Sequence, residues 1–169
     1  DDTIAYIVFV YAVKGVEKGG SPKARLVYVG NQICNLKTFR PCKVLTSSRR
    51  PPATGWEVDL YSALGELLGL THHRDADITS AFTSVPMPNL GQRHYVRAKG
   101  EVLECLCEAY NVPFNKDAER LVWRLAQNLY GFPAAQDYFD DHLGHQLQIA
   151  GWEILNPDIT LHIFVKYGE

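Results

Sequence analysis

The chain has 169 residues, of which 46% are hydrophobic, so it is long enough to bury a core and its composition excludes a disordered polypeptide. The formal net charge of −2 argues neither for nor against a nucleic-acid partner. The charge is unevenly spread, because residues 1–50 have a balance of +6 and residues 51–169 a balance of −8. A basic N-terminal region that binds phosphates and an acidic remainder that binds a metal ion would produce this distribution. An ordinary uneven surface explains it equally well.

The cysteines and the apolar runs predict an intracellular protein without a membrane segment. The spacing of Cys34, Cys42, Cys105 and Cys107 matches neither a paired zinc site nor a compact disulfide framework, so we expect reduced thiols. The longest apolar run, 4–13, is too short for a membrane helix, and the two aspartates before it have the wrong charge for a signal peptide. Because the first residue is not Met, we expect a piece of a longer chain.

Two stretches near the N-terminus predict a β-hairpin. Residues 3–13 and 23–33 are rich in β-branched and aromatic residues, and the Gly and Pro residues between them predict a turn. Lys23 and Arg25 are two residues apart on the second strand and therefore share a face. Such a face can hold a triphosphate by charge and by the guanidinium fork, while solvated charges on an edge strand are the alternative interpretation.

A loop and a well-marked helix follow. Residues 35–55 lack periodicity and carry several Pro, Ser and Arg residues, which predicts a loop. Thr54 and Glu57 form a capping box and Gly69 supplies a stop, so we expect a helix that packs on the core. Its apolar stripe comprises Leu60, Tyr61, Leu64, Leu67 and Leu68. His72 and His73 would point to opposite faces of the next strand, which favours structural roles over a shared metal.

The stretch D-A-D-I-T-S-A-F at 75–82 is the leading candidate for a functional site. Asp77 ends an extended segment, and a carboxylate at a strand end can hold Mg²⁺, which prefers hard oxygen ligands. If the backbone turns through the small residues 79–81, Phe82 returns to the same side as a flat wall under a sugar ring. The alternative is a strand-to-helix junction in which Asp77 caps the helix and Phe82 belongs to the core.

The C-terminal half alternates extended and helical segments. We expect extended structure at 94–97, 121–129 and 161–167, a loop at 85–91 and a helix at 101–111. Gly131 should turn the chain into a further helix that begins with Pro133 and ends at Gly151. His142 and His145 lie three residues apart on that helix, and we interpret them as part of a solvated face rather than a metal site.

Six segments occur in an order that carries more information than any one of them. They are K-A-R-L-V at 23–27, D-I-T-S-A-F at 77–82, H-Y-V-R at 94–97, V-W-R-L at 122–125, L-Y-G at 129–131 and G-W at 151–152. Together they resemble the reverse transcriptase domain of copia-type retrotransposons over nearly the whole chain. After the glycine turn that family often has Gln-Ala-Pro or a Pro-x-Ser-Gly variant, whereas this chain has P-A-A-Q at 133–136.

The resemblance implies RNA-directed DNA polymerisation. In that reaction two Mg²⁺ ions activate a primer 3′-hydroxyl and stabilise the leaving pyrophosphate. The implied partners are an RNA or DNA template with its primer, deoxynucleoside triphosphates and the remainder of a polyprotein, with no membrane. The family carries a Tyr/Phe-x-Asp-Asp turn beyond the point where this chain ends, so we expect the chain alone to lack two catalytic carboxylates and to be inactive.

The resemblance also implies roles for individual residues. Asp77 is the implied catalytic residue, and together with the backbone carbonyl of Ile78 it would hold the metal. Phe82 would block a ribose 2′-hydroxyl. Tyr130 and Gly131 belong to the motif that lies under the template base and the nucleotide, where only Gly permits close backbone approach. Lys23 and Arg25, and less directly the lysine at 14, would lie over the incoming nucleotide.

The expected fold class is α+β, with an antiparallel palm sheet backed by helices and with interleaved fingers elements, as in a right-hand polymerase. The expected divisions are 1–55 (fingers hairpin and loop), 56–86 (palm with the Asp77 motif), 87–125 (second fingers insertion) and 126–169 (palm continuation). Two rival interpretations remain: an element remnant that folds but catalyses nothing, and a nucleic-acid-binding module without chemistry. The second would need exposed aromatics on the sheet, for which Tyr28 and Tyr95 are the candidates.

Overall fold

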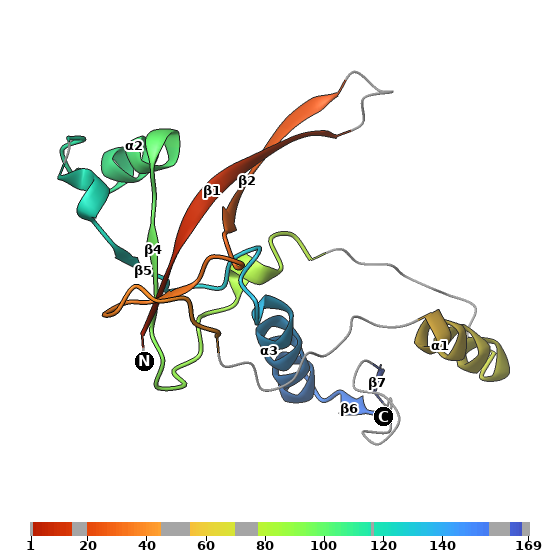
Figure 1. Ribbon diagram of the computed structural model, residues 1–169. Coiled ribbons are helices and arrows are strands. Elements are labelled where there is room, and N and C mark those ends of the chain that lie inside the picture. Colours follow the sequence, from red (N-terminus) through yellow and green to blue (C-terminus); the bar gives the residue numbers. More distant parts are fainter. Residues whose placement is uncertain are drawn as a thin grey trace.

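The computed structural model describes residues 2–14, 20–44, 55–69, 78–115, 117–155 and 163–166. These residues form an α+β fold with a five-stranded mixed sheet, a small two-stranded sheet and three α-helices (Figure 1). In chain order the elements are β1 Thr3–Lys14, β2 Ser21–Tyr28, β3 Cys34–Asn35, α1 Gly55–Leu67, η2 Phe82–Ser84, β4 His94–Arg97, α2 Gly100–Ala109, η3 Ala118–Arg120, β5 Trp123–Arg124, α3 Ala135–Ile149, β6 Glu153–Ile154 and β7 Phe164–Val165.

Strand β1 organises the large sheet. Its first residues pair with β3 on one edge and with β4 on the other, and its remainder pairs with β2 from Ile7 to Lys14. The first half of β1 is buried, whereas its second half is exposed and extends with β2 as an arm away from the rest of the chain (Figure 1). The predicted hairpin is therefore confirmed, although β2 ends at Tyr28 rather than at 33. The Val29 N–H still donates to the Tyr6 carbonyl in register with the hairpin, and the chain then turns away at Gly30.

The expectation of an antiparallel sheet is wrong at one pair. β1 and β4 run parallel, with Thr3 opposite His94 and Tyr6 opposite Arg97, so the sheet is mixed. A parallel pair needs a long crossover, and here the crossover contains β2, β3 and α1. Sequence patterns predict each strand from its own residues, and they carry no direct record of which distant strand will become its neighbour.

The core lies where β1, β2 and β4 meet α2 and the segment before α3. Leu103 and Cys107 of α2 pack there with Tyr28, which is 1% exposed and contacts the ring of Phe132 edge-on at 5.2 Å between centroids. Burial raises the pKa of the Tyr28 hydroxyl to about 12. Tyr28 is therefore not the exposed sheet aromatic that a nucleic-acid-binding module would need, and that expectation is wrong.

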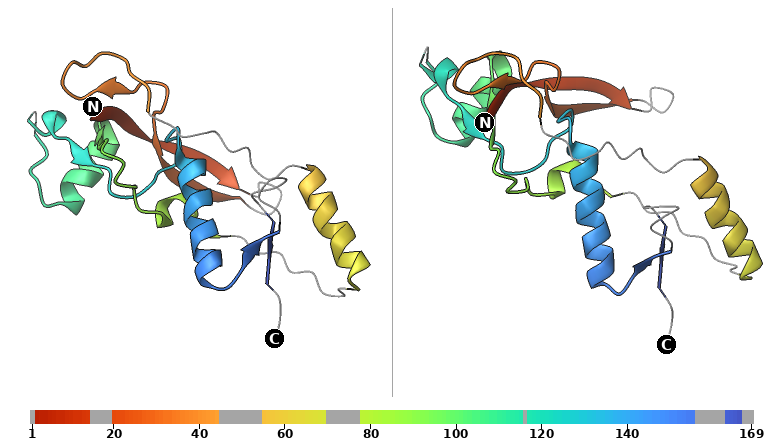
Figure 2. Two further views of the ribbon diagram at one scale, coloured as in Figure 1. Left: turned by 90° about the horizontal axis from the view of Figure 1, so that it is seen from below. Right: turned by 60° about the horizontal axis from the view of Figure 1, so that its bottom comes forward.

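The expectation that α1 packs on the core is also wrong. Figure 2 shows α1 standing apart from the large sheet, and its stripe residues Tyr61 and Leu67 are 51% and 81% exposed. The helix instead faces the end of α3 and β7 across a cavity of about 320 Å³, lined in part by Leu147 and Trp152. An amphipathic stripe predicts which face of a helix is buried, but not its partner. Thr54, half of the predicted capping box, lies outside the described residues.

The remaining predictions vary in accuracy. The strand at 94–97 is confirmed as β4, and the helix at 101–111 is confirmed as α2 with slightly different ends. The continuous strand expected over 121–129 is wrong, because β5 covers only Trp123–Arg124 and a single bridge follows at Gln127. The next helix begins at Ala135, two residues after the predicted start, and β7 covers two residues of the strand expected at 161–167. His72 and His73 lie outside the described residues.

A buried histidine fastens the N-terminal end of β1 to β4. His94 Nδ1 and Thr3 Oγ1 share a hydrogen bond of 2.7 Å, and the His94 ring packs edge-on against Phe132 at 4.9 Å. Burial lowers the pKa of His94. Beside it, the Arg93 guanidinium lies 2.8 Å from an Asp2 carboxylate oxygen, and this pairing lowers the pKa of the Asp2 carboxyl.

The free energy of unfolding should therefore fall as the solution is acidified from pH 6.5. Since the folded-state pKa of His94 lies below its ordinary value of 6.5, the unfolded chain binds the proton first, and stability present above pH 6.5 is lost as the pH drops toward the folded pKa. Urea denaturation between about pH 7 and pH 5 should show a flatter profile for His94→Gln than for the parent. His145→Gln, at an exposed histidine, is the control, and equal slopes in His94→Gln and parent would contradict this assignment.

Candidate nucleotide-binding site

Three segments that are distant in sequence meet on one side of the hairpin arm. They are β2, the turn and short helix at 79–84, and the segment 126–131 that leads into α3. Backbone bonds hold them together: the Tyr28 N–H donates to the Tyr130 carbonyl at 2.7 Å, and the Asn128 N–H donates to the Val85 carbonyl at 2.8 Å. Four of the predicted site residues lie on this framework: Arg25, Phe82, Tyr130 and Gly131.

Arg25 and Tyr130 form a cation–π pair. The guanidinium carbon lies 5.2 Å from the centroid of the Tyr130 ring. Such a pair at an exposed site contributes about 0.5–1 kcal/mol and holds the guanidinium plane over the ring. Of the described carboxylates, none forms an ion pair with Arg25. The pair thus orients a cation whose forked N–H donors match a phosphate or carboxylate group.

Phe82 packs against the same tyrosine. Its ring meets Tyr130 edge-on at 5.1 Å and Phe139 of α3 edge-on at 5.8 Å. The predicted turn before it is confirmed, because residues 79–81 form a turn with Ser80 at a φ of 58°. Phe82 is half-buried and packs on the core, so the core interpretation is correct for one side of the ring. The Phe82 ring is therefore packed beside Tyr130, the ring over which the Arg25 guanidinium lies.

Gly131 permits the closest approach in this region. It has a φ of 79°, and a Cβ there would overlap the Tyr28 carbonyl oxygen and lie 2.8 Å from Val27 Cγ1. The backbone that approaches Gly131 is the end of β2 in the same chain, and the expected approach to a nucleotide stays a prediction. Gly30 mirrors this contact, since a Cβ on Gly30 would overlap the Gly131 carbonyl oxygen.

Asn128 locks the turn and was not predicted from the sequence. The residue is 1% exposed, and its Nδ2 donates to the Ala135 carbonyl at 2.8 Å while its Oδ1 accepts from the Leu129 N–H at 2.9 Å. The side chain therefore joins the start of the turn to the first residue of α3. The available signal was the tendency of Asn to bond to nearby backbone just before a glycine turn.

The other predicted residues have different outcomes. Lys23 is exposed and lies on the Arg25 face, because Lys23 pairs with Ala12 and Arg25 with Val10 across the hairpin. Ile78 is 45% exposed at the start of the turn. Asp77 lies outside the described residues, so its place relative to the cluster stays a prediction. Residue 14 ends β1, and its side chain is outside the described part of the structure.

No group of three or more His, Cys, Asp or Glu side chains suited to a metal ion occurs within the described ranges. On α3, His145 is exposed as predicted, whereas His142 is half-buried. Mg²⁺ binding by Asp77 and the Ile78 carbonyl therefore remains a prediction from the sequence. Across the described ranges, no helix combines the length and apolar character needed to cross a membrane.

In comparisons with models of protein families, with curated proteins and with solved structures, the chain has no significant match. The resemblance to copia-type reverse transcriptases therefore depends on the six sequence segments alone.

Gly131→Ala should lower the free energy of unfolding by at least about 2 kcal/mol. A left-handed backbone costs a residue with a Cβ about 1–2 kcal/mol, and overlap with the Tyr28 carbonyl adds to that. Gly144→Ala is the matched control inside α3, where the new Cβ would have an ordinary 3.5 Å contact with Phe164 Cζ. That change should stabilise by about 0.5–1 kcal/mol. Denaturant unfolding measures both, and equal small effects would show that the turn does not need glycine.

Proposed function

We propose that the chain is the fingers and palm portion of a copia-type reverse transcriptase. The observation that carries the proposal is the meeting of Arg25, Phe82, Tyr130 and Gly131, which the resemblance assigns to one nucleotide site and which come from three separate segments. Arg25, Phe82 and the adjacent residues Tyr130 and Gly131 are far apart in the sequence, and the Tyr130 ring contacts both Arg25 and Phe82. The α+β class is compatible with the right-hand polymerase arrangement, which is itself part of the proposal.

Within this proposal Arg25 and Lys23 bind the phosphates of the incoming nucleotide. Arg25 offers a planar fork whose orientation the Tyr130 ring fixes, while Lys23, two residues nearer the arm's tip, acts as a point charge. Because both side chains are exposed on a sheet face, phosphate binding should be strongly salt-dependent. The arm would place positive charge over the nucleotide without contributing to the chemical step.

Phe82 supplies the sugar selectivity. Its ring is held on two sides by Tyr130 and Phe139, so it cannot yield easily to a 2′-hydroxyl placed against its remaining face. A rigid wall discriminates better than a mobile one, because accommodation of the extra oxygen would require the packed rings to move. The short helix η2 and the turn at 79–81 direct Phe82 to this position.

Asp77 is assigned the metal-binding role, two residues before the turn at 79–81 in the sequence. Magnesium ions would supply charge neutralisation at the transferred phosphoryl group and activation of the primer hydroxyl. The neighbouring residue Ile78, whose carbonyl is the second proposed ligand, is 45% exposed. The burial of Tyr28 argues against the rival interpretation as a nucleic-acid-binding module without chemistry. An inactive element remnant differs from an active polymerase only in catalysis, so an activity assay must distinguish them.

Primer extension tests this proposal directly. The assay uses a polypeptide that continues through the aspartate pair of the resembled family, with Mg²⁺ and deoxynucleotides. Asp77→Asn should reduce extension by about 10³-fold or more, because an amide cannot replace a charged metal ligand. Asp75→Asn, two residues away, is the matched control and should extend at the parent rate. An active Asp77→Asn variant would remove Asp77 from the catalytic set, and an inactive parent would favour the remnant.

The same assay with ribonucleotides examines Phe82. Phe82→Ala should raise ribonucleotide incorporation relative to deoxyribonucleotide by about tenfold or more, since the wall against the 2′-hydroxyl is gone. Phe139→Ala leaves the Phe82 ring in place but removes one of the two rings that hold it, so it should relax selectivity less than Phe82→Ala does. If both variants keep the parent selectivity, Phe82 has only its packing role.

A further inference from the structure

The two edges of the hairpin arm differ in their protection against another strand. The outer edge of β2 carries Pro22 and Lys23, a residue without an N–H and an exposed charge, both of which discourage edge pairing. β1 contains no charged residue and no proline from Thr3 to Val13. The arm thus has one edge with the usual protective residues and one without them.

The unprotected edge of β1 is open over its second half. β4 pairs with this edge from Thr3 to Tyr6 and the chain then leaves the sheet to enter α2. Beyond Tyr6, no described strand pairs with β1 on this side. The vacant stretch continues the line of β4, so a further strand would extend the existing sheet.

The hydrogen bonds of β1 show to which side each of its backbone N–H and C=O groups points. The Thr3 N–H donates to the Arg93 carbonyl on the β4 side, whereas the Tyr6 carbonyl accepts from Val29 on the opposite side. Because these directions alternate along a strand, the N–H and C=O groups of residues 9, 11 and 13 point to the open edge. Those of residues 8, 10 and 12 point to β2, with which they pair.

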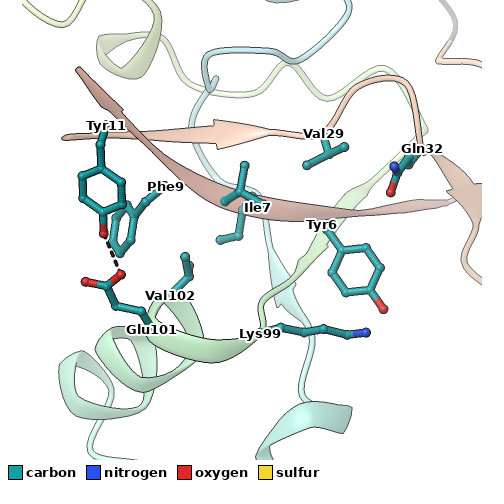
Figure 3. Close-up of a pocket in the computed structure, with 10 residues that line it drawn as sticks. Tyr6, Ile7, Phe9, Tyr11, Val29, Gln32, Lys99, Glu101 and Val102 are labelled. Carbon is teal, nitrogen blue, oxygen red and sulfur yellow. Dashed lines mark hydrogen bonds between the residues drawn. The ribbon is translucent and has the colours of Figure 1, made fainter.

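The side chains along this edge are apolar and unusually exposed. Tyr11 and Val13 are 62% and 61% exposed, and Val10 is 47% exposed. An open groove of about 510 Å³ runs over β1 from the segment after β2 to the start of α2, where the Tyr11 hydroxyl donates to a Glu101 carboxylate oxygen at 2.7 Å (Figure 3). Exposed apolar side chains beside unpaired backbone groups form a template for strand addition.

We propose that the open edge of β1 binds the β1 edge of a second copy of this chain. The two strands run antiparallel about a twofold axis, so that the same edge serves both partners. A register centred on Tyr11 places Tyr11 opposite its counterpart and Phe9 opposite Val13 of the other copy. This register pairs all the outward N–H and C=O groups of residues 9, 11 and 13.

The chemistry of the edge favours this occupant over a nucleic-acid strand. Of the described residues that line the groove, two are charged, Lys99 and Glu101, and their signs are opposite. Lys99 lies over the Tyr6 ring at 4.9 Å and Glu101 accepts the Tyr11 hydroxyl, so both already have contacts within the chain. A phosphate backbone requires net positive charge, whereas a neutral apolar strand fits another like itself. The basic face that carries Arg25 points away from Tyr11, because Tyr11 pairs with Ala24 and neighbouring residues alternate.

Sedimentation equilibrium across a concentration series tests the proposal. The parent should show a monomer–dimer equilibrium, and Val13→Pro should weaken it at least about tenfold, because proline removes an N–H that points to the open edge and not to β2. Val13→Lys should act similarly by adding an edge charge. Ala24→Lys is the matched control, since it adds the same charge on the same face of the neighbouring strand and should leave the dimer intact.

Hydrogen exchange identifies the surface that associates. In the dimer the amides of Phe9, Tyr11 and Val13 should exchange slowly, and dilution should make them fast, while those of Val8 and Val10 stay protected by β2 at every concentration. A chain that remains monomeric throughout contradicts the proposal. A dimer in which the exchange of residues 9, 11 and 13 does not depend on concentration contradicts it too, because association would then use another surface.

Discussion

The candidate site depends on a close backbone approach between the end of β2 and the turn at Gly131. The Tyr28 N–H bonds to the Tyr130 carbonyl at 2.7 Å, and a side chain at Gly131 would overlap the Tyr28 carbonyl. This contact sets the distance between β2 and the segment that leads into α3, and so places Arg25 over the Tyr130 ring. Asn128 fixes the other end of the turn by bonding to Ala135 and Leu129. The residues of the cluster are thus oriented by contacts between backbone groups of the same chain.

The hairpin arm combines two surfaces of different character. One face presents Arg25 and Lys23, which pair across the strands with Val10 and Ala12, and this face is suited to phosphate. The open β1 edge is neutral and apolar, and it is suited to another strand. Phosphate binding and strand pairing use different groups, side-chain cations in the first case and main-chain amides in the second. The two proposals can therefore succeed or fail separately.

Local signals predicted local structure well. β1, β4 and α2 were found because their periodicity and their flanking residues agree, and the turn before α3 was found from Gly131. Long-range features were missed for a physical reason: the parallel pairing of β1 with β4 and the position of α1 depend on partners far along the chain. Whether Tyr28 is exposed could not be predicted, because alternation along a strand does not say which face the core occupies. The cluster of Arg25, Phe82 and Tyr130 was predicted only through the resemblance, since nothing in the spacing of residues 25, 82 and 130 indicates contact.

The salt dependence of primer–template binding tests the central claim, that the Arg25 face binds phosphate, most directly. The measurement compares the parent chain with Arg25→Ala and with Arg120→Ala, which removes the same charge from an exposed arginine of η3. We predict that Arg25→Ala weakens binding and lowers the slope of log affinity against log salt by about 1, as expected for the loss of one phosphate contact. Arg120→Ala should leave affinity and slope at the parent values. Equal slopes for the parent and Arg25→Ala, or binding that ignores salt, would contradict the account.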